Sequence, residues 1–354
     1  MRLDRIACLT LILAGTAFAS TAGPEADLPV RLNRLSDRVV AAWVGEYAMS
    51  NQTIAVASPK GIVVIDTYAS RIYQDRIRRA VEKEFGRSDY FAVINTHQHY
   101  DHTNGNQLYA HLPIIAHQAA REGMLNDLAG VPAWFARVNH AVQDMDARQK
   151  TFDPETREGK TNLENIAYWR TVIQDMQQGH ISTPPNMTFT DRLSLHLGGL
   201  TLNLYAFPGL HTKGDIVAHI PEEKVLCVGD MNNDGWLPPL SKEAATDPAY
   251  LLRTWQEVLE RGPDVRYVLP GHSYVKVSFE SFKWRYDYFK TLWEGLTKAK
   301  AAGKSLAEAQ TLFAFETTFP TQKDMIRKLP GRAGGQEVDV HAQNIEILWA
   351  ALQK

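Results

Sequence analysis

Residues 97–102 read HQHYDH and place three histidines and one aspartate within six positions. Imidazole nitrogens and carboxylate oxygens are the ligands that Zn²⁺ prefers in proteins. Because residues i and i+2 of an extended segment point the same way, His97 and His99 can bind one ion together. Asp101 and His102 lie one step further along and can reach a second ion. We interpret this run as a metal-binding motif, and a histidine-rich surface loop as the rarer alternative.

Three further ligand-type residues follow apolar runs that we predict to be buried strands. His211, Asp230 and His272 each come within five residues of the end of such a run. Open α/β sheets bind their ligands at the carboxyl ends of the strands. One histidine alone would more often be structural, so it is the shared placement that assigns these three to the centre formed by residues 97–102.

The apolar patterns predict the elements that must position these side chains. Alternating or continuous apolar runs predict strands, and apolar residues at helical spacing predict helices. The expected strands are 53–57, 61–66, 90–94, 200–206, 225–228 and 265–269. The expected helices are 70–85, one that Asp247 and Pro248 begin, 282–296, one behind a capping box at 305–308, and 345–352. Strands and helices alternate, so the class is α/β or α+β with layered sheets.

The composition is that of a soluble globular protein. The chain has 354 residues, of which 44% are hydrophobic and 22% charged. It carries 38 basic and 40 acidic residues, a formal charge of −2. No basic excess is available to attract phosphate groups, so we expect no nucleic-acid partner. A small-molecule substrate fits this balance better.

The first residues have the pattern of a secretory signal peptide. Arg2 and Arg5 precede an apolar run at 6–15, which is shorter than the ~20 residues that span a bilayer. A small-x-small site then predicts cleavage after Ala19, hence a signal peptide at 1–19, a periplasmic or secreted protein and no membrane anchor. An uncleaved anchor helix is the alternative. Residues 20–45 are expected to form a leader outside the fold.

At all seven candidate ligands the chain resembles the metallo-β-lactamase superfamily. The HxHxDH motif is complete at 97–102, and His211 stands in a Gly-x-His-Thr-x-Gly setting. Asp230 and His272 each follow a glycine, as in that family. The resemblance covers about residues 50–275 and implies a four-layer αβ/βα sandwich at 46–275.

The resemblance also implies a ligand set for two Zn²⁺ ions per chain. One ion would be held by His97, His99 and His211. The other would be held by Asp101, His102 and His272. Asp230 would bridge the two ions.

Two adjacent cations lower the pKa of a water molecule between them and supply hydroxide near neutral pH. Asp101 lies where a carboxylate can orient that nucleophile and carry a proton, and we expect it to be the catalytic residue. Three polar residues that flank the ligands are candidates to orient them. They are Thr96, Thr212 and Asp215.

Departures from subfamily patterns narrow the expected reaction. His99 stands where di-iron relatives carry glutamate, which favours zinc hydrolysis. Asp230 resembles the ester, thioester and lactone hydrolases of the family, whereas the signal peptide resembles its secreted β-lactamases. We expect an exported hydrolase of a lactam, lactone, ester or thioester, β-lactamase-like. The alternatives are a thioester or lactone hydrolase of the glyoxalase II type, a non-catalytic zinc-binding protein and a di-iron redox protein.

Two regions lie outside the motif pattern. Residues 118–185 form an insertion that we expect to be helical, with Trp134 and Tyr168 among its aromatic residues. It either caps the metal cleft or packs a small core of its own. Residues 236–239 are candidates for the rim of the cleft. The aromatic-rich stretch 276–354 is expected to be helical, to pack on the same domain and to offer a surface for a homo-oligomer.

Overall fold

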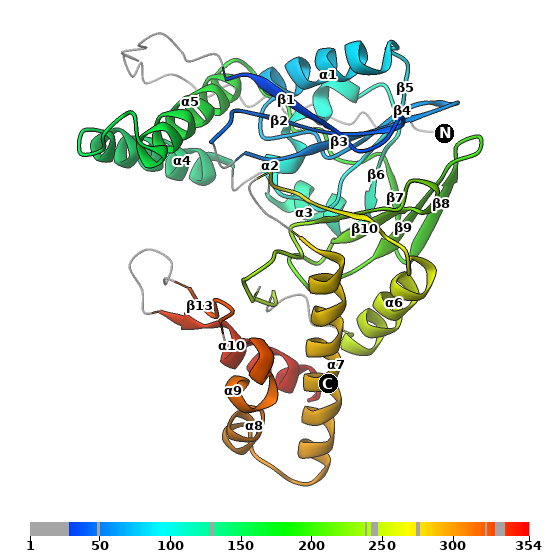
Figure 1. Ribbon diagram of the computed structural model, residues 1–354, viewed down its shortest axis with the longest axis vertical. Helices are drawn as coiled ribbons and strands as arrows, with labels where there is room; N and C mark the ends of the chain where they lie inside the picture. Colours follow the sequence, from blue (N-terminus) through cyan, green and yellow to red (C-terminus); the bar gives the residue numbers. More distant parts are fainter. Residues whose placement is uncertain are drawn as a thin grey trace, which may run out of the picture.

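The structure is a computed structural model in which two sheets pack face to face between layers of helices (Figure 1). It describes residues 28–47, 50–127, 131–237, 239–241, 247–273, 277–322, 324–329 and 337–353. The expected signal peptide at 1–19 lies outside these residues.

The first sheet has seven strands, which follow one another in sequence order. They are β1 (Val30–Arg34), β2 (Val39–Val44), β3 (Thr53–Ser58), β4 (Gly61–Ile65), β5 (Tyr90–Ile94), β6 (Ile114–His117) and β7 (Met187–Phe189). β1 to β4 are antiparallel, and β3 and β4 form the hairpin that the sequence predicts. From β4 onward each strand pairs in parallel with the next. The carboxyl ends of β4 and β5 therefore lie side by side at one edge of the sheet.

The second sheet has five strands in the order β12-β11-β10-β9-β8. They are β8 (Arg192–His196), β9 (Thr201–Ala206), β10 (Ile216–Ile220), β11 (Val225–Gly229) and β12 (Tyr267–Pro270). β11 and β12 are parallel neighbours, so the residues that follow both strands emerge at the same edge.

The inner faces of the two sheets bury a common apolar core. Val56, Ile65 and Ile94 from the first sheet pack in one cluster with Leu204 and Cys227 from the second. Because these strands are buried on both faces, they read as continuous apolar runs in the sequence.

The outer layer over the first sheet contains α1 and the last helix of the insertion, α5 (Figure 1). α1 (Arg71–Phe85) begins at Ser70, whose side chain caps the helix, and ends at Gly86 in a left-handed conformation. The insertion is helical, as expected. It contains α3 (Gln118–Asp127), α4 (Val131–Gln149) and α5 (Arg157–Gln177).

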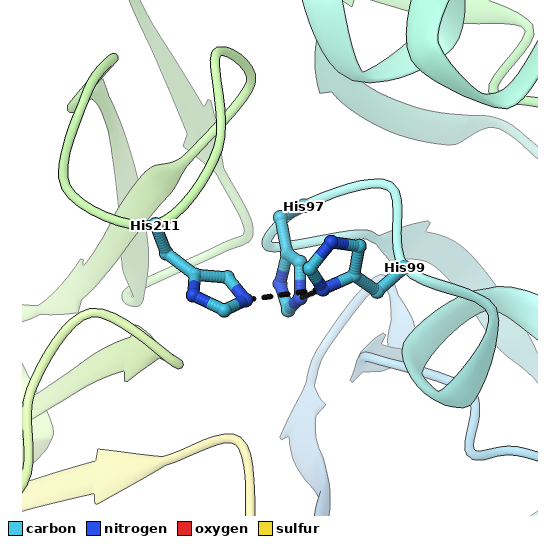
Figure 2. Close-up of side chains that lie close together, drawn as sticks. All are labelled: His97, His99 and His211. Carbon is cyan, nitrogen blue, oxygen red and sulfur yellow. Dashed lines mark hydrogen bonds between the residues drawn. The ribbon is translucent and has the colours of Figure 1, made fainter. Parts of the chain in front are cut away.

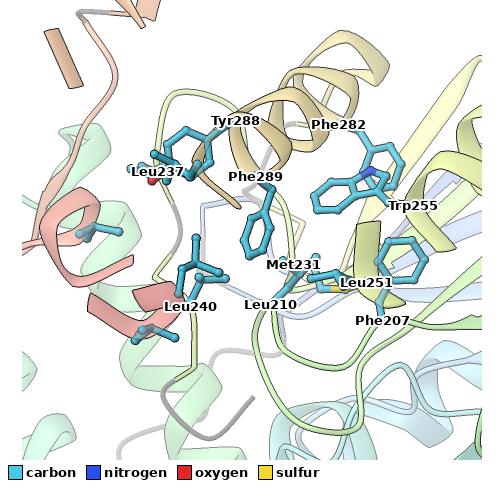
Figure 3. Packing of buried hydrophobic residues seen from close by; sticks show 14 of the residues in the cluster. Phe207, Leu210, Met231, Leu237, Leu240, Leu251, Trp255, Phe282, Tyr288 and Phe289 are labelled. Carbon is cyan, nitrogen blue, oxygen red and sulfur yellow. The ribbon is translucent and has the colours of Figure 1, made fainter. Parts of the chain in front are cut away.

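The outer layer over the second sheet is built from α6 (Pro248–Arg261) and α7 (Phe279–Ala301). Trp255 of α6 and Phe282 of α7 pack with Phe207 in a large aromatic core (Figure 3). Shorter elements follow α7. They are α8 (Leu306–Leu312), α9 (Phe315–Thr318), β13 (Lys328–Leu329), β14 (Val338–Asp339) and α10 (Val340–Ala351). Residues of α10 belong to the same core, so the C-terminal stretch packs on this domain.

These layers confirm the predicted αβ/βα sandwich. The expected leader differs, because within residues 20–45 the chain enters the first sheet at Val30. β1 and β2 are short and pair with each other over five positions, and β2 then pairs with β3. Val39 and Val40 are fully buried, so this segment is part of the fold. Within the described part of the chain, no helix has both the length and the apolar character needed to cross a bilayer.

Candidate metal centre

The histidine motif occupies the loop that follows β5. His97 lies in the loop, and His99 precedes the single turn of helix α2 (Tyr100–Thr103) in an extended conformation. The helical turn changes the direction in which successive side chains point. Asp101 and His102 therefore face a different position from His97 and His99.

One group of ligand atoms consists of three imidazole nitrogens (Figure 2). Nδ1 of His99 lies 3.2 Å from Nε2 of His97 and 3.0 Å from Nε2 of His211. The three rings come from two loops, and Figure 2 shows them pointing toward one another. We call His97, His99 and His211 the first group.

The second group consists of Asp101, His102 and His272. Oδ2 of Asp101 lies 3.6 Å from Nε2 of His102 and 3.6 Å from Nε2 of His272. The imidazole of His102 is fully buried, whereas the carboxylate of Asp101 is 27% exposed. The aspartate is therefore the most exposed member of this group, since His272 is 17% exposed.

Asp230 lies between the two groups. Its Oδ2 is 3.1 Å from Nε2 of His272 and 3.4 Å from Nε2 of His102. The same oxygen is 3.7 Å from Nε2 of His211 and 3.9 Å from Nε2 of His97. A single carboxylate oxygen is thus within reach of both groups.

These distances fit bound zinc. Four ligands placed tetrahedrally at ~2.0–2.2 Å from Zn²⁺ are about 3.3–3.6 Å apart, and the ligand-atom distances given above, 3.0–3.9 Å, lie around that spacing. Oδ1 of Asp230 is buried and has no hydrogen-bond partner, which is costly for a carboxylate unless a cation neutralises it. The converging donors of both groups are imidazole and carboxylate, the set that zinc prefers.

The glycines before Asp230 and His272 allow this close approach. Gly229 has φ +52°, a conformation that favours glycine. A Cβ atom on Gly271 would overlap Oδ1 of Asp230 and Cε1 of His102. The Gly-Asp and Gly-His pairs in the sequence therefore have a steric cause.

The two groups differ in electrostatics. Burial lowers the pKa of His97 and lowers that of His211 to about 4, so both rings are neutral and offer lone pairs. Burial also disfavours charge on His102, but the carboxylates of Asp230 and Asp101 outweigh it and raise the pKa of His102. Without a cation, a proton on His102 compensates these carboxylates.

Zinc and protons should therefore compete at the second group. A ring whose pKa is raised is protonated at higher pH, and an ion must displace that proton to bind. We expect the affinity for the second ion to fall between about pH 8 and about pH 6, with a smaller change at the first group. Calorimetric zinc titrations in buffers of different ionisation enthalpy measure the released proton. Equal observed heats in all buffers, with one affinity at both pH values, would contradict this expectation.

Asp66 is a residue of the site that the motif analysis missed. Its Oδ2 accepts a hydrogen bond from Oγ1 of Thr96 at 2.7 Å and lies 3.0 Å from Nδ1 of His102. An acceptor on Nδ1 leaves Nε2 of His102 free to bind a metal. Asp66 directly follows the apolar strand β4, so the rule that identified Asp230 would have found it. Its φ of +58° is unusual for a residue with a side chain.

The three candidate orienting residues contact the ligand loops as expected. Oγ1 of Thr96 lies 3.0 Å from Nδ1 of His97. The buried carboxylate of Asp215 accepts hydrogen bonds from the backbone N–H of His211 at 2.7 Å and from Oγ1 of Thr212 at 2.6 Å. These bonds hold the loop that presents His211.

The C-terminal helices hold the loop after Asp230. Arg285 of α7 is 3% exposed and donates hydrogen bonds to the carbonyl oxygens of Asn233 and Trp236. Oδ1 of Asn344 in α10 accepts from the backbone N–H of Leu240. Trp236 itself is 48% exposed, and its place at the rim of the cleft stays a prediction.

The insertion reaches the motif through aromatic contacts. The ring of Trp134 in α4 lies 5.4 Å from that of Tyr100, the residue before Asp101. It also lies 6.5 Å from the ring of Trp169 in α5. Insertion aromatics thus pack both on one another and on the loop of the metal centre.

The sequence model of the metallo-beta-lactamase superfamily matches residues 48–272. The chain belongs to the metallo-β-lactamase superfamily. This match spans all seven ligand positions and the strands from β3 to β12. The superfamily is typically metal-dependent, and this chain has candidate histidine and aspartate metal sites.

Two relatives in the superfamily share 27% identity with the chain. For metallo-beta-lactamase type 2 of Bacteroides fragilis the match covers 145 residues, 38% of this chain and 57% of that protein. For the human acyl-coenzyme A thioesterase MBLAC2 it covers 227 residues, 59% of this chain and 68% of that protein. The chain thus matches little more than half of the bacterial enzyme's length.

Among solved structures, the sec-alkylsulfatase Pisa1 from Pseudomonas sp. is similar with a TM-score of 0.53. The identity is 13%, and the match covers 90% of this chain and 49% of that chain. This similarity shows a shared fold that extends beyond the two sheets into the C-terminal part.

Proposed function

We propose that this superfamily member is a two-zinc hydrolase that cleaves the carbonyl-type bond of a small molecule. The bond would be that of a lactam, lactone, ester or thioester. The observation that carries the proposal is Oδ2 of Asp230, which lies 3.1–3.9 Å from ligand nitrogens of both groups. A structural zinc site holds one ion with four protein ligands and has no open position. The arrangement here instead offers two groups of three ligands each, and the two groups share the carboxylate of Asp230.

Each residue then has a defined task. His97, His99 and His211 would hold one ion, Asp101, His102 and His272 the other, and Asp230 both. Two bound zinc ions supply a hydrolytic nucleophile by lowering the pKa of water. The partly exposed carboxylate of Asp101 would orient the attacking water, accept its proton and return that proton to the leaving group.

Among these substrate classes, thioesters and esters are supported by a match over a larger share of the chain than lactams are. The match to the human thioesterase covers 59% of this chain, compared with 38% for the lactamase. A carboxylate stands at position 230, which is the pattern of ester, thioester and lactone hydrolases noted above. β-Lactam hydrolysis is the second candidate, carried by the match to the Bacteroides fragilis enzyme.

We also propose that the protein is exported and works in the periplasm or outside the cell, after cleavage behind Ala19. The basic start, the short apolar run and the small-x-small site support this proposal. Its partner would be a small-molecule substrate, with no nucleic acid and no membrane anchor. Fractionation of expressing cells tests it, because retention of the uncleaved chain in the cytoplasm would contradict it.

Metal analysis and a substrate panel test the proposed activity. Protein purified without added metal should contain about two zinc ions per chain and hydrolyse an acyl thioester, lactone, ester or lactam. Chelation should abolish this hydrolysis, and zinc should restore it. Two zinc ions without turnover would support the non-catalytic zinc protein, and iron with an optical absorption band the di-iron redox protein.

Trp134 allows a separate test of the insertion as a cap over the cleft. We expect Trp134→Ala to change the ratio of kcat/KM values between a long-chain and a short-chain acyl substrate about 10-fold, because an apolar wall is lost. Both metal ions should remain bound. Phe152→Ala, at the far end of the helix pair, serves as the control. An unchanged ratio would mean that these aromatics pack only the insertion's own core.

A further inference from the structure

Asn51 lies at the centre of the second group and belongs to no motif. Its side chain is 2% exposed. Nδ2 donates a hydrogen bond to Oδ2 of Asp101 at 3.0 Å. The same nitrogen lies 3.3 Å from Nε2 of His102 and 3.5 Å from Nδ1 of His272. One amide group therefore touches all three members of the second group.

Backbone hydrogen bonds around Asn51 fix the position of its main chain, from which the side-chain amide extends. Asn51 forms an isolated antiparallel bridge with His272. The N–H of Gln52 donates to the carbonyl oxygen of Gly271 at 2.7 Å, and that of Ser273 donates to Ser50 at 3.0 Å. The main chain thus holds Asn51 beside the last ligand, and only the side-chain torsions remain to be set.

Tyr168 of the insertion sets the remaining orientation. Its hydroxyl donates to Oδ1 of Asn51 at 2.6 Å, and its side chain is fully buried. Burial raises the pKa of Tyr168, so the hydroxyl keeps its proton and acts as a donor. An amide that receives a hydrogen bond at its oxygen must present its N–H₂ group on the other side, toward Asp101.

The ring of Tyr168 is itself held firmly. It stacks on Tyr73 of α1 with ring centres 5.4 Å apart and an interplanar angle of 10°. It also makes edge contacts with Tyr68 and Trp169. α1 and α5 therefore place the hydroxyl before any ligand or substrate binds.

We infer that Tyr168 and Asn51 are positioning residues, through which the insertion aims the carboxylate of Asp101 at the second metal position. A flipped amide would turn its oxygen toward that carboxylate, and the two acceptors would repel each other. The inference rests on the proposed function, because it assigns the second group to a metal ion. Outer partners of this kind typically change metal affinity or activity about 10–100-fold.

The test compares Tyr168→Phe with Tyr73→Phe. Tyr73 is the matched control, since it lies in the same aromatic stack and its hydroxyl donates to Thr171 at 2.9 Å. Titration of the metal-free protein with Co²⁺, followed by visible absorption, measures the affinities for the first and second ion without any turnover. Near-ultraviolet circular dichroism and the Tm report whether each variant keeps the fold.

We expect Tyr168→Phe to lower the affinity for the second ion about 10-fold and to leave the affinity for the first ion unchanged. It should also lower kcat, while KM stays within about two-fold. Tyr73→Phe should match the wild type. When Asn51→Ala is already present, adding Tyr168→Phe should not lower the affinity for the second ion further, because Tyr168 acts on Asp101 only through Asn51. If Tyr168→Phe alone lowers the Tm, the comparison of Asn51→Ala with the double variant tests the inference instead.

Two results would overturn the inference, and they are distinguishable. Two ions in the wild type, with equal second-ion affinities for the two tyrosine variants, would refute the positioning role alone. A wild-type chain that binds fewer than two ions would refute the proposed function together with it.

Discussion

Asp101→Asn should lower kcat about 10²–10⁴-fold while the protein stays folded, the range typical of a lost proton-transfer group. The amide keeps the size of the carboxylate but cannot accept a proton from the attacking water. It also weakens the second group, because Oδ2 is the atom that lies 3.6 Å from both His102 and His272. The first group is untouched and should still bind one ion. Steady-state kinetics and metal content measure both effects.

The matched control for this variant is Asp89→Asn. Asp89 precedes β5, whereas the motif follows it, so the two aspartates lie at opposite ends of one strand. Asp89 pairs with Arg87 on the surface and should tolerate the change. If Asp101→Asn keeps kcat within about tenfold of the control, Asp101 is not the proton carrier.

Asp230→Asn should have the second large effect, on metal content and activity together. Oδ2 of Asp230 lies close to Nε2 nitrogens of both groups. Replacing it by an amide removes the negative charge between two cations, so we expect loss of one ion and at least about a 100-fold fall in kcat/KM. Metal analysis after dialysis, together with kinetics at saturating zinc, separates the two contributions.

Asp234→Asn is the control on the same loop. Asp234 is exposed and accepts hydrogen bonds from the N–H of Ser278, a task that asparagine also performs. It should retain two ions and wild-type kinetics. Equal metal content in Asp230→Asn and Asp234→Asn would show that Asp230 does not join the two groups.

The ligand positions could be predicted from the sequence because they follow strongly apolar strands. His97, Asp230 and His272 stand at strand ends whose register the buried core fixes. Local patterns also predicted α1 and the capping box at Ser305, since caps act within one turn.

Residues that act across the fold could not be found in the same way. Asn51 and Tyr168 are 117 positions apart and meet only because α5 packs on α1 beside the first sheet. Nothing in the local sequence of either residue indicates a polar role. β1 was missed for a related reason: three of its five residues are polar, and its two apolar residues, Val30 and Leu32, are only partly buried, so its pattern is weak. Its pairing with β2 is a tertiary effect.

Along the sequence, the seven ligands lie on both sides of the turn between α4 and α5. Four of them precede residues 150–156, and His211, Asp230 and His272 follow. A chain cut in this turn would yield fragments that each lack a member of both groups. α4 and α5 pack against each other, with a hydrogen bond from Asn162 to the carbonyl oxygen of Met145, and would supply the surface on which the halves reassociate. Restored hydrolysis would then report complementation, which makes this scaffold a candidate split enzyme.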